Sequence, residues 1–138
     1  MELTLGAPVH ELGTQVGRLA GFEVEPDTRR VTSIVYSRHG DLGPDALAVG
    51  LVSIGHVHEN GDLELRPDPG PKPLVPSSTR TLIGPATHVR TSGRDLGHVT
   101  GVDLDPAERR LVAVFGRKHW WNRHFTLAAE QAEYTASV

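Results

Sequence analysis

Short runs of apolar residues, separated by turn residues, recur along the whole chain. The first three runs cover residues 16–24, 31–36 and 47–51, and each is rich in Val, Leu, Ile or Phe. Runs of this length, bounded by Gly, Pro, Asn and Asp, are typical of β-strands. No run keeps the 3.6-residue period of a helix over helical length, so helix should be limited to a turn or two. The pattern therefore predicts an all-β protein.

The pattern of the first part of the chain returns in the last part at a constant offset of 80 residues. Residues 9–35 align without a gap on residues 89–115, and glycine, proline and apolar positions coincide. The matched pairs include Gly13 and Gly93, Gly17 and Gly97, Gly21 and Gly101, Pro26 and Pro106, and Arg30 and Arg110. Shared glycine and proline positions reflect shared backbone requirements, so the chain is predicted to hold two copies of one structural unit.

Each copy contains a hairpin signal and a glycine inside a strand. Pro26 and Pro106 occupy the second position of two four-residue turns, where the fixed φ of proline fits. Gly21 and Gly101 interrupt the preceding strands, which predicts a bulge or bend of the kind that curls a small sheet into a barrel. The second copy is the shorter one, and its last strand either comes from residues 133–138 or is absent.

A proline-rich stretch separates the copies. Half of the ten prolines fall in residues 66–76, and such a stretch favours extended polyproline conformation and acts as a linker. The predicted organisation is a first repeat over residues 1–66, a linker over 67–80 and a second, shortened repeat over 81–138. Each repeat is under about 70 residues and buries little apolar surface alone. We therefore expect the two lobes to pack on each other, or a homodimer to complete them.

Composition and charge exclude or disfavour several kinds of site and partner. The chain has no cysteine, which excludes disulfides and thiolate metal sites. No apolar stretch approaches the ~20 residues of a membrane-spanning helix and the first residues show no signal-peptide pattern, so we expect a cytoplasmic protein without a membrane span. The net charge is −3, and the first 66 residues carry five Arg against ten Asp and Glu. This acidic half disfavours nucleic acid, which would have to bind the second half.

The order of glycines, small apolar residues and an acidic-proline turn is the same in both copies. The residues are Gly6-Ala7-Pro8-Val9, Gly13, Val16-Gly17-Arg18-Leu19 and Glu25-Pro26 in the first copy, and Val89, Gly93, Leu96-Gly97-His98-Val99 and Asp105-Pro106 in the second. This order resembles the PRC-barrel family, named after the capping subunit of the purple bacterial photosynthetic reaction centre. The resemblance covers most of the chain. It implies two small six-stranded β-barrels that serve as an adaptor or docking module, not as an enzyme.

The segment 117–124 is the most distinctive local sequence, because it holds both tryptophans and three basic residues. Trp and Arg are enriched at binding hot spots, and basic residues mixed with aromatic ones also suit phosphate contact and base stacking. Alternatively, the tryptophans cover an open end of a barrel while the basic side chains stay solvated. The candidate binding residues are Arg117, Lys118, Trp120, Trp121 and Arg123.

Two histidines raise the question of a metal site. His56 and His58 alternate along one predicted strand, which places both imidazoles on one face. With a third ligand such as Glu59 or His39 they are candidate metal ligands. Two histidines at this spacing also occur by chance on an exposed strand face beside a turn, and this is the interpretation that we favour.

Paired carboxylates occur at equivalent positions of the two copies. Glu23 and Glu25 in the first, and Asp103 and Asp105 in the second, alternate with apolar residues and run into a turn. A glycosidase-like pair needs one buried acid with a shifted pKa, whereas these pairs are expected on a solvated outer face. No motif for nucleophilic catalysis, phosphate binding or a cofactor occurs, so we expect a protein that is not an enzyme and holds no cofactor.

Two classes of partner remain for a docking module. A protein partner is the first interpretation, and association with RNA or the ribosome is the alternative, by analogy with the ribosome maturation factor, whose second domain belongs to the PRC-barrel family. A small enzyme stays open only if a buried cleft collects histidines and carboxylates. RNA is favoured if the segment 117–124 joins four arginines of the second repeat in one basic face. These are Arg90, Arg94, Arg109 and Arg110.

Overall fold

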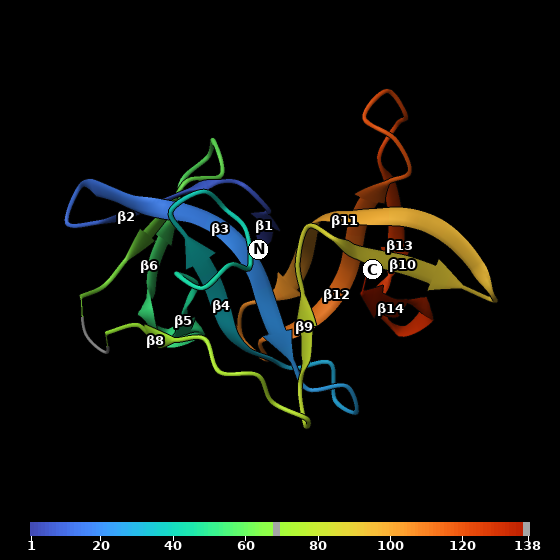
Figure 1. Cartoon of the computed structure of the whole chain (residues 1–138), viewed down its shortest axis with the longest axis horizontal. Helices are drawn as coiled ribbons and strands as arrows, with labels where there is room; N and C mark the ends of the chain where they lie inside the picture. The colour runs from blue at the N-terminus through green and yellow to red at the C-terminus, as the bar shows by residue number, and fades with distance from the viewer. Residues whose placement is uncertain (68–69, 137–138) are drawn as a thin grey trace.

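The computed structural model describes residues 1–67 and 70–136 and consists of strands joined by turns and loops (Figure 1). The protein is all-β, as the apolar pattern predicts. In the described residues, helix is limited to two 3₁₀ turns, η1 (Leu51–Ser53) and η2 (Ala129–Gln131). Neither is long enough to cross a membrane, and no other helix is found in these ranges. The strands form two curved sheets that lie side by side as two barrel-like lobes.

The first lobe is a curled half-barrel of eight strands within the described residues. Its strand order is β6-β7-β2-β3-β4-β5-β8, in which neighbouring strands are hydrogen-bonded. Strand β9 also pairs with β3. The proline-rich segment is extended, and its two-residue strand lies at the edge of the sheet, where the missing N–H of proline is tolerated. Residues 68 and 69 of the predicted linker lie outside the described residues. The strands are β2 (Pro8–Glu11), β3 (Thr14–Val24), β4 (Val31–Ser37), β5 (Leu47–Gly50), β6 (Ile54–Val57), β7 (Leu63–Leu65), β8 (Lys72–Pro73) and β9 (Thr81–Ile83).

The second lobe has six strands in the part of the chain that is described. The order is β13-β12-β11-β10-β14, and β1 pairs with β11 outside this path. Its last strand is β14, so the predicted strand near residues 133–138 is present up to residue 136. The strands are β1 (Glu2–Thr4), β10 (Thr87–Thr91), β11 (Arg94–Asp105), β12 (Arg110–Arg117), β13 (Phe125–Ala128) and β14 (Glu133–Ala136).

The internal repeat of the sequence is a repeat of the structure. The long hairpin β3–β4 corresponds to β11–β12, and β5 with η1 corresponds to β13 with η2. Both long strands have a register shift next to the predicted glycine, one between Leu19 and Gly21 and the other between Val99 and Gly101. The bulges predicted from the two glycines are therefore confirmed.

The two lobes exchange one short strand each. Strand β1 of the first repeat pairs with β11 of the second, where Leu3 lies opposite Val102. Strand β9, the equivalent element of the second repeat, pairs with β3 of the first, where Ile83 lies opposite Phe22. Figure 1 shows β9 running beside β3 between the lobes. Because each repeat completes the sheet of the other, the chain has the organisation of a strand-exchanged dimer within one polypeptide.

Glycine makes the exchange sterically possible. A Cβ atom at Gly21 would lie 2.4 Å from the carbonyl oxygen of Ile83, and one at Gly101 would lie 2.7 Å from that of Leu3. Real Cβ atoms do not approach backbone oxygen so closely, so any larger residue would push the exchanged strand away. The same two glycines thus permit both the bulge and the close approach of the other repeat.

Equivalent residues also meet across the approximate two-fold axis. Arg30 and Arg110 form an antiparallel bridge. On one side the N–H of Val31 donates to the carbonyl of Arg109 at 2.7 Å, and on the other the N–H of Leu111 donates to the carbonyl of Arg29 at 2.9 Å. Most buried apolar side chains of both lobes belong to one continuous core, which includes Phe22 and Ile83, and a smaller cluster contains Ala20, Val35 and Ala46. The lobes therefore pack on each other through hydrogen bonds and a shared core.

Candidate functional site: an exposed tryptophan loop

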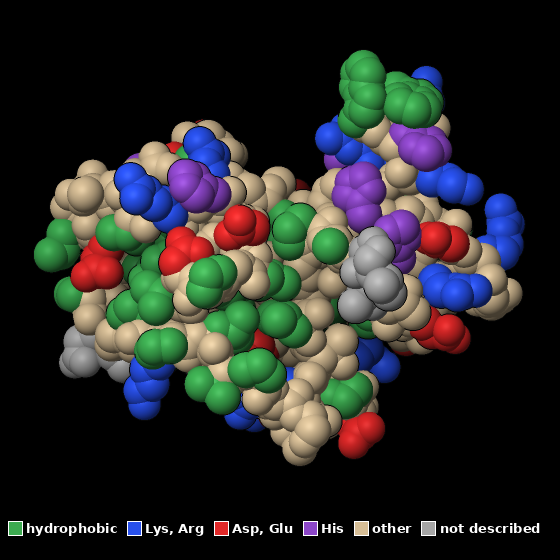
Figure 2. Space-filling model, viewed as in Figure 1, with side chains coloured by type: hydrophobic (Ala, Val, Ile, Leu, Met, Phe, Trp, Pro, Cys, Tyr) green, Lys and Arg blue, Asp and Glu red, His purple; other side chains and the backbone are tan. Residues whose placement is uncertain are grey.

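The tryptophan loop (residues 118–124) connects β12 to β13 and projects from the second lobe (Figure 1). Trp120 is 76% exposed and Trp121 is 65% exposed. The indole rings meet edge to face with centroids 5.6 Å apart, and the His119 ring stacks on Trp121 at 4.6 Å. Figure 2 shows this aromatic tip with basic and histidine side chains around it. The tryptophans therefore do not cover the end of a barrel.

The equivalent loop of the first repeat shows that the fold does not require this exposure. Residues 38–46 connect β4 to β5, and their apolar side chain Leu42 packs against the buried residues Ala20 and Val35. That loop is also acidic, with the carboxylate of Asp45 accepting a hydrogen bond from the N–H of Arg38 at 3.1 Å. The two equivalent loops thus differ in conformation. Residues 38–46 fold onto the first lobe, whereas the tryptophan loop projects into solvent.

Arg117 holds the base of the tryptophan loop. Its Nη1 donates a hydrogen bond to the carbonyl of Trp120 at 3.0 Å, which ties the strand end to the tip. The Nε of Arg117 is buried and has no hydrogen-bond partner among the described residues. Of the predicted binding residues, Arg117 is therefore a positioning residue, while Lys118 and Arg123 are exposed and free to meet a partner.

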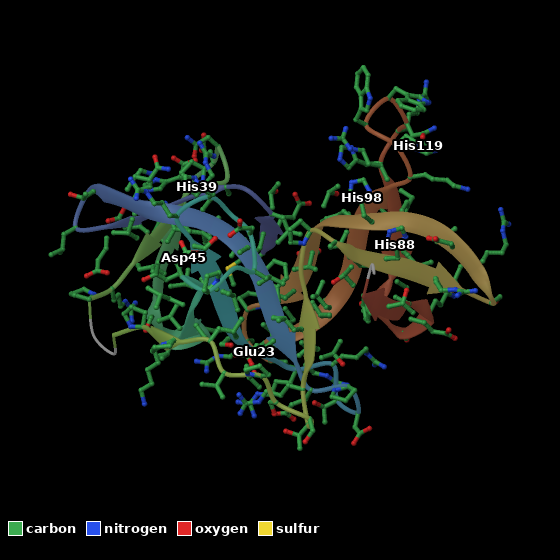
Figure 3. All side chains as sticks on the ribbon, in the orientation of Figure 1. Glu23, His39, Asp45, His88, His98 and His119 are labelled. Atoms are coloured by element: carbon green, nitrogen blue, oxygen red, sulfur yellow. The ribbon has the colours of Figure 1, made fainter. Side chains whose placement is uncertain are left out.

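Histidine side chains lie below the loop on the same side of the second lobe. His98 lies opposite Arg117 in the β11–β12 pair, and His124 lines the same shallow hollow. Burial lowers the pKa of His98, and the nearby charges of Arg117 and of His88 lower it further. Figure 3 shows His88, His98 and His119 on this side of the second lobe. Sequence reasoning missed His98, although counting back from the hairpin turn places it opposite Arg117.

The arginines of the second repeat do not form one basic face. Arg109 and Arg110 lie at the turn end of β12, opposite the end that carries the tryptophan loop. Arg110 faces Glu108 at 3.7 Å, and Arg90 donates to the carbonyl of Gly93 at 2.9 Å on the β10–β11 hairpin. Arg109 and Arg110 therefore do not add to the positive charge at the tryptophan loop.

The histidines considered as metal ligands are exposed. The rings of His56 and His58 meet edge to face at 4.7 Å, and they border an open hollow with Asp62 and Glu64. His10 Nε2 lies 3.2 Å from Asp62 Oδ2 in the same hollow. Within the described ranges no group of three or more such side chains is arranged to hold a metal ion. This hollow collects histidines and carboxylates, but it is an open surface rather than a buried cleft.

The expectation of a solvated face for the carboxylate pairs is wrong for Glu23. Glu23 is 7% exposed, and the hydroxyl of Ser33, on the neighbouring strand, donates a hydrogen bond to its carboxylate. The reason is the exchanged strand β9, which pairs with β3 at this position and removes it from solvent. Asp103, its equivalent, is half-buried and lies 3.0 Å from the Met1 nitrogen.

A scan of the chain against protein-family models and a search of the curated proteins both find no match. The function of the protein is therefore inferred from the geometry of the chain itself and from the motif order of the two repeats.

Proposed function

We propose that the protein is a non-enzymatic docking module that binds a protein partner through the tryptophan loop. The observation that carries this proposal is the exposure of Trp120 and Trp121 in a loop whose equivalent is folded away. Large exposed aromatic side chains are unfavourable in water and are enriched at the centres of protein interfaces. The motif order that resembles PRC-barrel proteins supports the same role.

The chemistry of the loop defines the surface that it fits. The indoles supply an apolar patch, and the neighbouring residues Lys118 and Arg123 are exposed and positively charged. Basic side chains lie beside the apolar tip in Figure 2. The fitting partner is a protein surface with an apolar pocket bordered by Asp or Glu. Charge at the rim would speed association and select the partner, while the buried indoles would supply most of the affinity.

The test is a quantitative capture experiment with the full chain and a nuclease-treated native lysate. The double variant Trp120→Ala, Trp121→Ala should capture at least tenfold less of the partner than the unmodified chain does. The partner is then purified, and its binding to both proteins is measured directly. Since both indoles are exposed, the free energy of unfolding should change by less than about 0.5 kcal/mol. Leu12→Ala is the matched control, because Leu12 is 78% exposed at another hairpin tip and should leave capture unchanged.

Two outcomes would overturn the proposal. If nuclease treatment abolishes capture, the bound species is RNA and the alternative function replaces this one. If the double tryptophan variant captures the partner as well as the unmodified chain does, the loop is not the binding surface. Charge reversal by Lys118→Glu with Arg123→Glu should weaken binding of the purified acidic partner, and should do so more at low salt than at high salt.

A further inference from the structure

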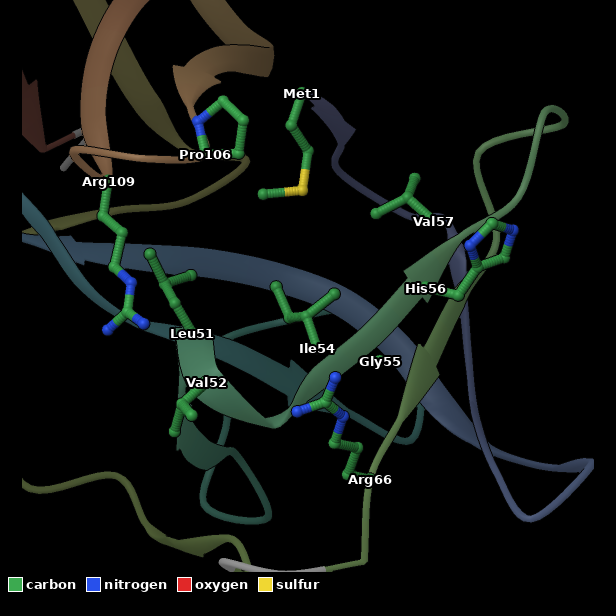
Figure 4. Close-up of a pocket in the computed structure, with 10 residues that line it drawn as sticks. All are labelled: Met1, Leu51, Val52, Ile54, Gly55, His56, Val57, Arg66, Pro106 and Arg109. Atoms are coloured by element: carbon green, nitrogen blue, oxygen red, sulfur yellow. The ribbon is translucent and has the colours of Figure 1, made fainter.

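A second candidate site lies between the lobes, at the opposite end of β12 from the tryptophan loop. The inter-lobe cleft has a volume of 440 Å³, within the range of small-molecule sites. Leu51, Ile54 and Val57 of the first repeat form its apolar side, and the turn that carries Pro106 and Arg109 of the second repeat closes it. Figure 4 shows these residues around the hollow.

Arg109 and its equivalent in the first repeat have a backbone conformation that is unfavourable for arginine. Arg109 has φ 59° and its equivalent Arg29 has φ 60°, the left-handed region in which glycine or asparagine is favoured. The carbonyl groups of these residues accept the hydrogen bonds between the lobes, but a glycine carbonyl would serve equally. The backbone contacts therefore do not explain why arginine, rather than glycine, occupies these two positions.

The cleft combines positive charge with apolar surface. Across the described ranges, the guanidinium of Arg109 has neither an ion pair nor a hydrogen bond, and the same holds for Arg66. Figure 4 shows the two guanidinium groups on either side of Leu51 and Val52. The cleft lining contains no acidic residue. Such a site attracts a ligand that has one negative group and an apolar body.

The equivalent cleft on the other side of the two-fold axis provides an internal comparison. It has a volume of 300 Å³ and is lined by Pro26, Arg29 and residues of η2 and β14. Glu130 stands there in place of Val52, so this cleft carries a carboxylate of its own beside Arg29. Of these two clefts, the larger one, with Arg109, has positive charge and no carboxylate among the described residues that line it.

We propose that the inter-lobe cleft binds a small amphipathic carboxylate, such as a medium-chain fatty acid. The planar guanidinium of Arg109 pairs with both carboxylate oxygens, because its donors match the spacing of a carboxylate. The alkyl chain lies on Leu51, Ile54 and Val57, and Arg66 adds positive charge at the opposite side. This site is independent of the tryptophan loop and of the proposed protein partner.

The test measures octanoate binding to the full chain by calorimetry and by the NMR signal of the methionine methyl group. The chain has one methionine, and Met1 lines the cleft, so its methyl signal reports this site. Saturable octanoate binding that shifts the methyl signal is expected. Acetate, which lacks the chain, and octanol, which lacks the charge, should each bind at least tenfold more weakly.

A matched pair of variants separates binding from folding. Arg109→Gly removes the guanidinium and also relieves the left-handed strain, so the melting temperature should not fall while octanoate binding weakens at least tenfold. Arg29→Gly makes the same change in the other cleft and should leave octanoate binding unchanged. The proposal is overturned if octanoate does not bind, if Arg109→Gly binds it as the unmodified chain does, or if Arg29→Gly loses as much.

Discussion

Replacement of Ile83 by alanine tests the strand exchange directly. The Ile83 side chain is fully buried, and it lies in β9 opposite Phe22 of the other repeat. The three carbons that the change removes represent about 2.4 kcal/mol of transfer free energy at about 0.8 kcal/mol per buried methylene. The cavity left behind adds to this, so Ile83→Ala should cost about 3–4 kcal/mol, in the middle of the range for such changes. This is a large share of the roughly 5–15 kcal/mol that stabilises a typical domain.

The assay is urea unfolding followed by far-ultraviolet circular dichroism. Tryptophan fluorescence is a poor probe here because both indoles are already exposed in the folded protein. Hydrogen exchange then locates the damage. Because β9 completes the sheet of the first repeat, faster exchange is expected in β3 at residues 22–24 rather than in β10 of the second repeat.

The neighbouring residue in the same strand is the control. Leu82 is 36% exposed, and Leu82→Ala should cost less than about 1 kcal/mol. If Ile83→Ala costs as little as Leu82→Ala, or if β3 keeps its protection while β10 and β11 lose theirs, the strand exchange does not hold in solution. The reciprocal change Leu3→Ala should increase exchange in β11 around Val102.

Three further predictions concern single positions. Gly97→Ala should destabilise the protein by at least about 2 kcal/mol in thermal melts, because φ is 128° and the new Cβ would lie 2.4 Å from the Arg117 carbonyl oxygen. Gly93 has open space around it, so Gly93→Ala should cost about 1 kcal/mol. Burial raises the pKa of Tyr134 to about 12, so the folded state holds its proton to higher pH than the unfolded state does and the urea midpoint should fall between pH 10 and about pH 12. Burial also raises the pKa of Tyr36, so Tyr134→Phe should reduce this fall without abolishing it. The lowered pKa of His98 means that stability should fall as pH drops below 6.5, and His98→Gln should flatten this dependence; equal slopes in both proteins would contradict the assignment.

Much of the lobe architecture is readable from the sequence because its determinants are local. Gly21 and Gly101 mark the bulges, the two proline turns mark the hairpins, and the short apolar runs mark the strands. The exposure of the tryptophans agrees with the interpretation of their segment as a surface, since neither indole is buried. These features depend on residues close to one another in the chain.

The strand exchange is not readable in this way. Leu3 has two equivalent partners, Phe22 in its own repeat and Val102 in the other, and both follow a glycine that admits a close strand. Local pattern cannot choose between partners that are alike, so the choice depends on how the whole chain is connected. The burial of Glu23 escaped prediction for the same reason, because β9 of the other repeat covers it.

The reciprocal pairing of β1 and β9 has a consequence for synthesis on the ribosome. Leu3 is made about 100 residues before its partner Val102. At roughly 5–20 residues per second, β1 waits about 5–20 seconds without its partner. During that interval the β3 edge that β9 will cover is also unpaired, and unpaired edges of this kind are where chains associate with one another. Nascent chains on neighbouring ribosomes therefore have an opportunity to exchange these strands between molecules.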